Sequence, residues 1–256
     1  MRSRPRFQAP VRWIAATTGH DRQAEQDTQP TAAAYPLSSA RPPSSSPTEA
    51  TRRVRRVPGL AIDVVRERYK AVRAEAGPGV TVVAATKYVS IGDMAVLADA
   101  GVEVVGENRV QDLLAKHASF ASVFRWHFIG HLQSRKVKAV NETCELVHSL
   151  ASESAARRLA VPALVEVNLS GEPTKSGVAP EELERVLGLY HDVRGLMTMP
   201  PLADDPEQSR PYFRRLRELA DAYGLRELSM GTSQDWRVAV DEGATLVRLG
   251  RVLYGE

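Results

Sequence analysis

The sequence has a single cysteine, lacks long apolar runs and shows no secretory signal. Cys144 alone cannot form an intramolecular disulfide framework and is compatible with a reducing compartment, so we expect a cytoplasmic protein. No segment approaches the roughly 18 consecutive apolar residues that a membrane span requires. A signal peptide would need an apolar core after its basic start, and that core is missing. These absences exclude a disulfide-stapled scaffold and predict no membrane partner.

The formal net charge of +3 is unevenly distributed along the chain. Residues 1–56 hold ten arginines and four acidic residues, a net charge of +6, which leaves −3 for the remainder. This segment is rich in Ala, Ser, Pro and Arg, and its composition predicts a disordered tail. Its Arg- and Ser-rich composition faintly resembles a transit peptide, but its four acidic residues argue against one. A nucleic-acid footprint should be a basic face on the folded part, so no nucleic-acid partner is expected. The tail could be an extension without function. Alternatively, its segment "RRVRR" could bind nucleic acid or a membrane surface.

Eight short apolar runs follow the tail, and helical patterns separate most of them. The runs are Thr81–Thr86, Val102–Gly106, Arg125–Ile129, Glu145–Ser149, Ala163–Asn168, Arg194–Met197, Glu227–Met230 and Thr245–Leu249. Strands that alternate with helices predict a parallel sheet, and eight such units that close on themselves form a (β/α)8 TIM barrel. We therefore expect a tail over residues 1–56 and a single barrel over residues 57–256. A doubly wound sheet is the alternative, but "TKYVSIG" is not the glycine fingerprint it needs.

The first run ends in a lysine, although the apolar residues before it are typical of a strand buried on both faces. Lys87 could simply mark the point where the chain meets water. A lysine in a pocket of low polarity, however, loses its proton more easily and becomes a nucleophile that can form a Schiff base. In a barrel, the functional groups gather where the strands end, and lysine, asparagines, hydroxyls and glycines follow the predicted strands. This convergence favours the nucleophile.

The last two predicted strands end in segments suited to a phosphate. "LSMGTS" and "VRLGR" place Gly231, Ser233 and Gly250 after strands seven and eight, where barrels often bind phosphate. Ordinary helix capping by Ser233 or Asp235 is the alternative. Arg248 lies within the last strand, where an arginine needs a partner, either a ligand or a structural salt bridge.

Several familiar catalytic motifs are absent. "GEPTKSG" lacks the glycine that a nucleotide-binding loop has immediately before its lysine. "HFIGH" has two histidines at zincin spacing but no glutamate, and it begins in a predicted strand, so no metal site is expected. No G-x-S-x-G elbow supports a serine hydrolase.

Taken in order, nine blocks resemble the pyridoxal-phosphate homeostasis protein family, whose fold is similar to the N-terminal barrel of alanine racemase. The blocks are "VVAATK", "GENRVQDLLAK", "WHFIGHLQSRKVK", "VHSL", "VEVNLSGEPTKSG", "GLMTMPP", "YFRRLREL", "LSMGTSQDW" and "GATLVRLG". The resemblance implies that Lys87 holds pyridoxal 5′-phosphate (PLP) as an internal aldimine, that Ser233 and the backbone near Gly231 and Gly250 hold its phosphate, and that Arg248 faces its pyridine nitrogen. The predicted cofactor-binding residues are Lys87, Asn108, Asn168, Ser229, Gly231, Ser233, Arg248 and Gly250.

The resemblance also implies a carrier or regulator of PLP and not an enzyme. A cation beside the pyridine nitrogen weakens the ring as an electron sink, and the chain stops at Glu256, whereas alanine racemase has a further domain that supplies a second base. PLP and the apo forms of PLP-dependent enzymes are the expected partners, and we expect a monomer. A racemase or lyase with a base from a partner is one alternative, and an interaction module without cofactor is another.

The sequence departs from the family pattern at three positions. Arg251 stands where a small hydroxyl residue is common, Ala151 where an aspartate is usual, and Arg135 where an asparagine is expected. The segment before "ALVEVN" is also short, which predicts a helix of about two turns between strands four and five.

Overall fold

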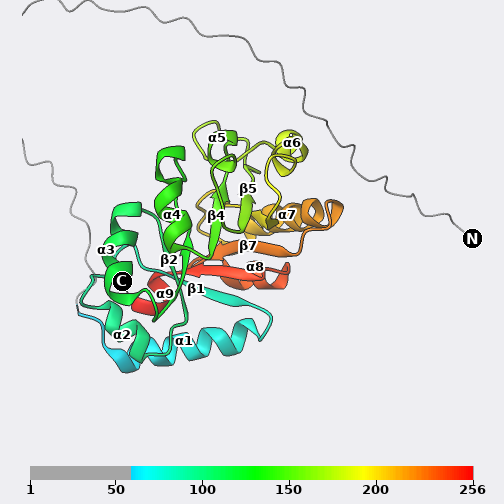
Figure 1. Ribbon diagram of the computed structural model, residues 1–256. Coiled ribbons are helices and arrows are strands. Elements are labelled where there is room, and N and C mark those ends of the chain that lie inside the picture. The colour runs from blue at the N-terminus through cyan, green and yellow to red at the C-terminus, as the bar shows by residue number, and fades with distance from the viewer. Residues whose placement is uncertain (1–58, 256) are drawn as a thin grey trace, which may run out of the picture. The chain divides into compact units, whose positions relative to one another are not determined.

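The computed structural model describes residues 59–255, which form a closed barrel of eight parallel strands with helices around it (Figure 1). The strands are β1 (Thr81–Ala85), β2 (Val104–Glu107), β3 (Arg125–Phe128), β4 (Leu146–Leu150), β5 (Ala163–Glu166), β6 (Val193–Met197), β7 (Glu227–Thr232) and β8 (Leu246–Leu249). Each strand pairs with the next in sequence, and β8 pairs with β1. The predicted (β/α)8 barrel is confirmed, whereas the predicted tail lies outside the described residues.

Helices lie on the outside of the barrel (Figure 1). They are α1 (Ile62–Ala76), α2 (Met94–Asp99), α3 (Val110–Phe120), α4 (Val137–Thr143), α5 (Glu153–Ala156), α6 (Leu183–Leu187), α7 (Arg210–Ala222), α8 (Trp236–Asp241) and α9 (Arg251–Tyr254), with short 3-10 segments at Ser134–Lys136, Pro180–Glu182 and Pro206–Ser209. All of these helices except α1, which precedes β1, and α9, which follows β8, lie between consecutive strands. The helix expected between β4 and β5 is shorter than predicted. It has four residues, and Pro162 disfavours helix in the residues just before β5.

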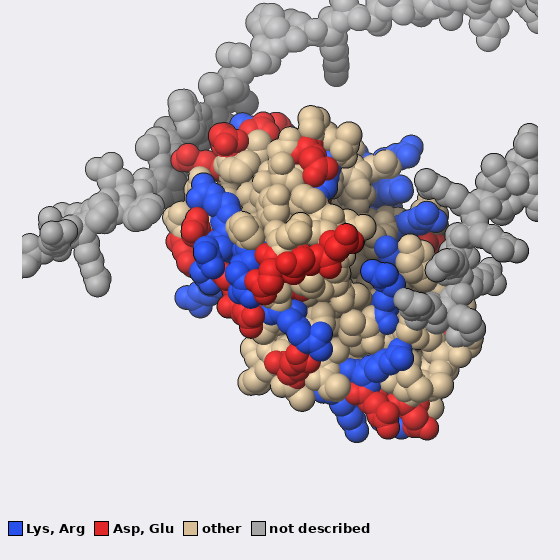
Figure 2. Space-filling model, turned by 180° about the vertical axis from the view of Figure 1, so that it is seen from behind, with Lys and Arg blue, Asp and Glu red and all other residues tan. Residues whose placement is uncertain are grey.

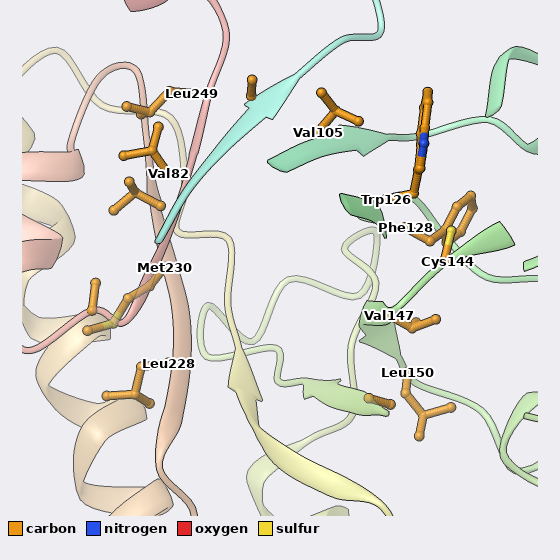
Figure 3. Close-up of a cluster of buried hydrophobic side chains, with 14 of the residues drawn as sticks. Val82, Val105, Trp126, Phe128, Cys144, Val147, Leu150, Leu228, Met230 and Leu249 are labelled. Atoms are coloured by element: carbon orange, nitrogen blue, oxygen red, sulfur yellow. The ribbon is translucent and has the colours of Figure 1, made fainter. Parts of the chain in front are cut away.

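Alternation along the strands divides the core into two apolar layers, because successive side chains of a strand point to opposite faces. One set faces the helices, and Figure 3 shows part of it, with Val82 and Met230 on one side of the barrel and Trp126 and Phe128 on the other. The second set fills the barrel interior: Val83, Val104, Leu146, Leu164, Met197 and Leu246, with Ile129 against them. The same alternation turns Arg248 inward, between Val247 and Leu249 of the outer layer.

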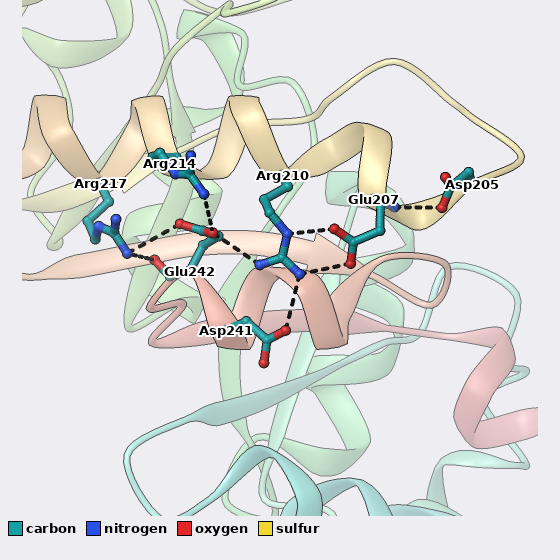
Figure 4. A network of polar contacts seen from close by, with 7 residues as sticks. All are labelled: Asp205, Glu207, Arg210, Arg214, Arg217, Asp241 and Glu242. Carbon is teal, nitrogen blue, oxygen red and sulfur yellow. Dashed lines mark hydrogen bonds and ion pairs between the residues drawn. The ribbon is translucent and has the colours of Figure 1, made fainter.

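An ion-pair network fastens α7 to the end of α8 (Figure 4). The buried carboxylate of Glu242 lies 3.1 Å from Arg210, 3.2 Å from Arg214 and 3.3 Å from Arg217. Although burial opposes ionisation, these guanidinium groups hold the pKa of Glu242 below its ordinary value. The network therefore secures the outer layer of helices and explains a buried charge without invoking a ligand.

Charged side chains of both signs cover the folded part. On the face shown in Figure 2, Lys and Arg lie beside Asp and Glu over much of the surface. Exposed pairs such as Arg125–Glu145, 2.8 Å apart, belong to this pattern. On that face the positive side chains are interspersed with negative ones and with uncharged surface. None of the helices in residues 59–255 has the length and apolarity needed to cross a membrane.

Candidate cofactor-binding site

Lys87 lies in the turn directly after β1, at the carboxyl end of the barrel. The strand that delivers it is buried, whereas the lysine itself is exposed. Its Nζ lies 4.8 Å from the centroid of the Tyr88 ring. Barrels carry their functional groups at this end of the strands. Lys87 therefore lies at the carboxyl-terminal mouth of the barrel, but it is exposed to solvent and not in the pocket of low polarity that its sequence position suggested.

A buried ion pair holds the backbone immediately before Lys87. Lys116 and Glu107 form this pair, and Lys116 Nζ also donates to the Thr86 carbonyl oxygen at 2.7 Å. The Thr86 hydroxyl donates to Glu107 Oε1 at 2.7 Å, and the Asn108 N–H donates to Glu107 Oε2 at 3.2 Å. One carboxylate therefore joins the ends of β1 and β2, which fixes the turn that carries Lys87.

The role of Lys116 was not predicted from the sequence. The available signal was its spacing, because Lys116 follows Val110 and Leu113 at intervals of three on the buried face of α3. A lysine on an apolar helical face needs a buried partner. Which acid supplies that partner depends on how the strands pair, and the spacing alone does not name Glu107.

Arg248 is held inside the barrel by neutral acceptors. Its guanidinium donates to the Thr198 carbonyl oxygen at 3.0 Å, to Met199 Sδ at 2.9 Å and to the Ser229 hydroxyl. Among residues 59–255, no carboxylate lies within ion-pair distance of it. The structural salt bridge that the sequence left open is thus not formed within the described part of the chain.

Burial lowers the pKa of Arg248 to about 10, and the more distant carboxylates of Glu166 and Asp235 oppose that shift. The group therefore stays protonated at neutral pH. It presents a fixed positive charge below the mouth of the barrel, where a ligand would meet it.

Two buried histidines continue the hydrogen bonding from Arg248 through the barrel interior. Ser229 Oγ lies 2.7 Å from His148 Nδ1, and His148 Nε2 lies 2.9 Å from His127 Nδ1. Burial, then the charge of Arg125, lowers the pKa of His127 to about 3. Burial, then His127 and Arg248, lowers the pKa of His148 well below its ordinary value. Both imidazoles are neutral at physiological pH, and the described residues contain no cluster of three or more metal-ligating side chains.

These histidines predict that the barrel loses stability in mild acid. At His127 the unfolded chain takes up a proton below about pH 6.5, whereas the folded protein does not until about pH 3, and burial also holds the pKa of folded His148 well below its ordinary value. The free energy of unfolding should therefore fall as the pH is lowered, and the loss due to His127 should be about 1.4 kcal/mol at about pH 5.5. Urea unfolding at neutral pH and at about pH 5.5 measures this loss. His127→Gln should reduce the pH dependence, and His191→Gln, at an exposed position, should leave it unchanged. A pH dependence equal in both variants would contradict the assignment.

The predicted phosphate cradle brings the ends of β7 and β8 together. Ser233 Oγ accepts hydrogen bonds from the N–H of Gly250 at 3.1 Å and from the N–H of Val252 at 3.3 Å. Both backbone donors are therefore satisfied by Ser233 Oγ, and the hydrogen of the Ser233 hydroxyl is left for another acceptor. Arg251, between these donors, is exposed. Its backbone lies in the cradle segment although its side chain lacks the hydroxyl of the family pattern.

Gly231 is needed for backbone geometry. Its φ is +89°, a conformation that side chains rarely adopt, and a Cβ there would lie 2.6 Å from the Ala239 Cβ and 2.9 Å from the Trp236 Cα. Only glycine lets α8 start this close to β7. The glycine thereby sets the position of the neighbouring Ser233.

The two predicted asparagines differ in what their side chains do. Asn108 Oδ1 is buried, and none of the described residues donates to it. The Asn168 side chain instead organises its own loop, since it donates to the Glu172 carbonyl oxygen at 2.9 Å and accepts from the Ser170 hydroxyl at 3.0 Å. Asn108 therefore has unused capacity for a ligand, whereas Asn168 shapes the loop after β5. Ser229, also predicted to bind the cofactor, is fully buried, with its hydroxyl engaged by Arg248 and His148.

A cavity of about 390 Å³ lies at the opposite, amino-terminal mouth of the barrel. It is lined by Gly79, Thr81, Arg125, His127, Glu145, Leu146, Pro162, Arg194, Glu227, Thr245 and Leu246. Most of these residues stand at or just before the first residues of strands, so the cavity is separate from the site around Lys87.

Comparison with known proteins identifies a matching family model and relatives that are similar in sequence. The family model described as alanine racemase, N-terminal domain, matches residues 60–256. A pyridoxal phosphate homeostasis protein from Aquifex aeolicus is 44% identical over 177 residues, which cover 61% of this chain and 78% of that protein. Another from Synechocystis sp. is 35% identical over 210 residues, with coverage of 73% and 96%.

Solved structures agree with this fold. PipY of Synechococcus elongatus PCC7942, solved with PLP bound, has a TM-score of 0.67 and 32% identity, and the match covers 75% of this chain and 100% of that one. Alanine racemase from Corynebacterium glutamicum has a TM-score of 0.61 at 19% identity, covering 77% of this chain and 61% of the racemase. The racemase is similar in fold alone.

Proposed function

This chain belongs to the pyridoxal phosphate homeostasis protein family, and on that premise we propose that its barrel carries PLP as a Schiff base on Lys87. Its role is in intracellular vitamin B6 homeostasis, without amino-acid turnover. One observation carries the proposal. Lys87 and Gly250 follow the paired strands β1 and β8, and a Cβ on Gly250 would lie 3.7 Å from the Ala85 carbonyl oxygen. The residue that would bind the aldehyde and the segment that would bind the phosphate thus follow neighbouring strands.

The residues of the mouth fit the cofactor. The Ser233 hydroxyl, whose oxygen accepts from the N–H groups of Gly250 and Val252, would donate its own hydrogen to the phosphate. Asn108 has a buried oxygen without a donor among the described residues. An unpartnered buried polar atom is unusual in a folded protein, and a bound ligand accounts for it. Asn168 would line the mouth through the loop that it organises.

Arg248 supports a carrier over an enzyme. Bound PLP supplies an electron sink for carbanion chemistry, and the strength of that sink depends on protonation of its ring nitrogen. We assign Arg248 to face this nitrogen. Because the guanidinium keeps its charge at neutral pH, it disfavours a second positive charge beside it and weakens the sink.

The cellular setting belongs to the same proposal. We place the protein in the cytoplasm as a monomer, with the apo forms of PLP-dependent enzymes as recipients of the cofactor. Cys144 supports the reducing compartment, since it is a free, buried thiol whose pKa burial raises to about 12. Such a thiol is inert and needs no disulfide partner.

Borohydride trapping tests the proposal directly. The full chain is incubated with PLP, reduced, digested and examined by mass spectrometry, and the label should lie on Lys87. In parallel, deuterium incorporation into the α-position of L-alanine should not exceed that given by free PLP. A label on another lysine would refute the attachment site, and rapid α-proton exchange would show an enzyme.

A further inference from the structure

We propose that Ser229 and His148 are positioning residues for Arg248, in a buried hydrogen-bonded chain whose direction the arginine sets. The chain runs from Arg248 of β8 through Ser229 of β7 and His148 of β4 to His127 of β3. It therefore crosses the barrel interior and ends at the cavity of the amino-terminal mouth, which His127 lines. The exposed fractions of these side chains are 0% for Ser229 and His148, 2% for His127 and 6% for Arg248.

Arg248 fixes the direction because a guanidinium can only donate. Its Nη1 donates to Ser229 Oγ, which leaves the serine hydrogen for the other neighbour, His148 Nδ1 at 2.7 Å. That nitrogen is then an acceptor, so neutral His148 carries its hydrogen on Nε2 and donates to His127 Nδ1 at 2.9 Å. His127 must in turn carry its hydrogen on Nε2.

The reverse direction leaves a buried group without a partner. If His148 carried its hydrogen on Nδ1, Ser229 Oγ would accept from both His148 and Arg248. The serine hydrogen would then have no acceptor among residues 59–255 at a site of zero exposure. Buried hydroxyl donors are almost always paired, so this arrangement is disfavoured. Neutral imidazoles are also required, and burial keeps the pKa of both histidines low.

As a consequence, the plane of the Arg248 guanidinium is fixed by its hydrogen bonds. Ser229, Thr198 and Met199 engage three of its five N–H groups. Two remain, the Nε–H and one N–H of Nη1, and their directions are set by the three that are engaged. On the proposed function, one of these groups would face the ring of PLP, so that His148 would act on the cofactor through Ser229 and Arg248.

The first test uses the protein without PLP and therefore does not depend on the proposed function. Nitrogen-15 NMR of labelled histidine at about pH 7 should show His127 and His148 as neutral Nε2–H tautomers. Separate Arg248 Nη signals should report hindered rotation of the guanidinium. Ser229→Ala should average the Nη signals, and His148 should no longer be held in the Nε2–H tautomer. The control is Ser149→Ala, at a buried serine that donates to the Gly130 carbonyl oxygen, and it should change neither the Nη signals nor the tautomer. An Nδ1–H tautomer at His148 in the wild type, or a guanidinium equally hindered in Ser229→Ala, would overturn the proposal.

The second test connects the chain to the cofactor. Ser229→Ala should raise the PLP dissociation constant about tenfold, as expected for loss of one orienting hydrogen bond to a charged group. The label should remain on Lys87, and Ser229→Thr, which keeps the hydroxyl, should restore the affinity. Unaltered affinity in a folded Ser229→Ala would remove the positioning role. Absence of PLP binding by the wild type would instead refute the proposed function. The hydrogen-bonded chain would still be tested, because the tautomers and the guanidinium rotation are measured without PLP.

Discussion

Lys87→Ala should lose all covalent retention of PLP while the barrel stays folded. The substitution removes the amine that would attack the aldehyde. It removes little packing, because Lys87 is exposed in a turn and its side chain lies over the Tyr88 ring. The backbone of the turn is held by Thr86, whose contacts to Lys116 and Glu107 do not involve the Lys87 side chain. Borohydride reduction followed by intact-mass measurement gives the retained fraction.

Two variants make this result specific. Lys87→Arg keeps a positive charge but lacks a nucleophilic amine, so it should also lose covalent attachment. Lys138→Ala removes an exposed lysine from α4 and should retain PLP fully. Non-covalent binding through the cradle should persist in both Lys87 variants, and it is measured by equilibrium dialysis. A reducible adduct in Lys87→Ala would assign the attachment to another lysine.

The strand pattern could be predicted because parallel strands buried on both faces are apolar along their whole length. Thr81–Thr86 was predicted and Thr81–Ala85 is observed, and Glu227–Met230 was predicted where the strand extends to Thr232. The ends differ by one or two residues because pairing with neighbours, and not composition, decides where a strand stops. Closure of the barrel followed from the number of units and from the rule that such crossovers are right-handed.

The placement of groups at the mouth also followed from the sequence, because all parallel strands end on the same side. The contacts that hold those groups did not. Lys116 and Glu107 are nine residues apart, but His148 and Ser229 are separated by 81. Their meeting depends on the closed ring and on which face of each strand is inward. "HFIGH" therefore suggested a comparison with metal sites, when His127 in fact belongs to a chain of hydrogen bonds inside the barrel.

Lys116→Met should destabilise the barrel strongly, by about 3–5 kcal/mol in the free energy of unfolding. The ion pair with Glu107 is almost completely buried, with exposed side-chain fractions of 5% for the lysine and 0% for the glutamate. Removing the lysine leaves a carboxylate whose remaining donors among residues 59–255 are the Thr86 hydroxyl and the Asn108 N–H. A buried charge with so little compensation is far more costly than a lost surface pair. Urea unfolding at neutral pH measures the difference.

A second substitution distinguishes loss of charge balance from loss of packing. Glu107→Met combined with Lys116→Met removes both charges at similar volume, and such replacements are often neutral or stabilising. Thr86 Oγ1 can then donate to the Gly106 carbonyl oxygen, which already lies 3.3 Å away. The double variant should therefore be more stable than Lys116→Met. Lys138→Met, which breaks an exposed pair with Glu142 at 3.9 Å, should cost less than about 1 kcal/mol. If Lys116→Met costs no more than Lys138→Met, the buried pair does not hold the turn before Lys87, and the position of that lysine must depend on β1 and its neighbours alone.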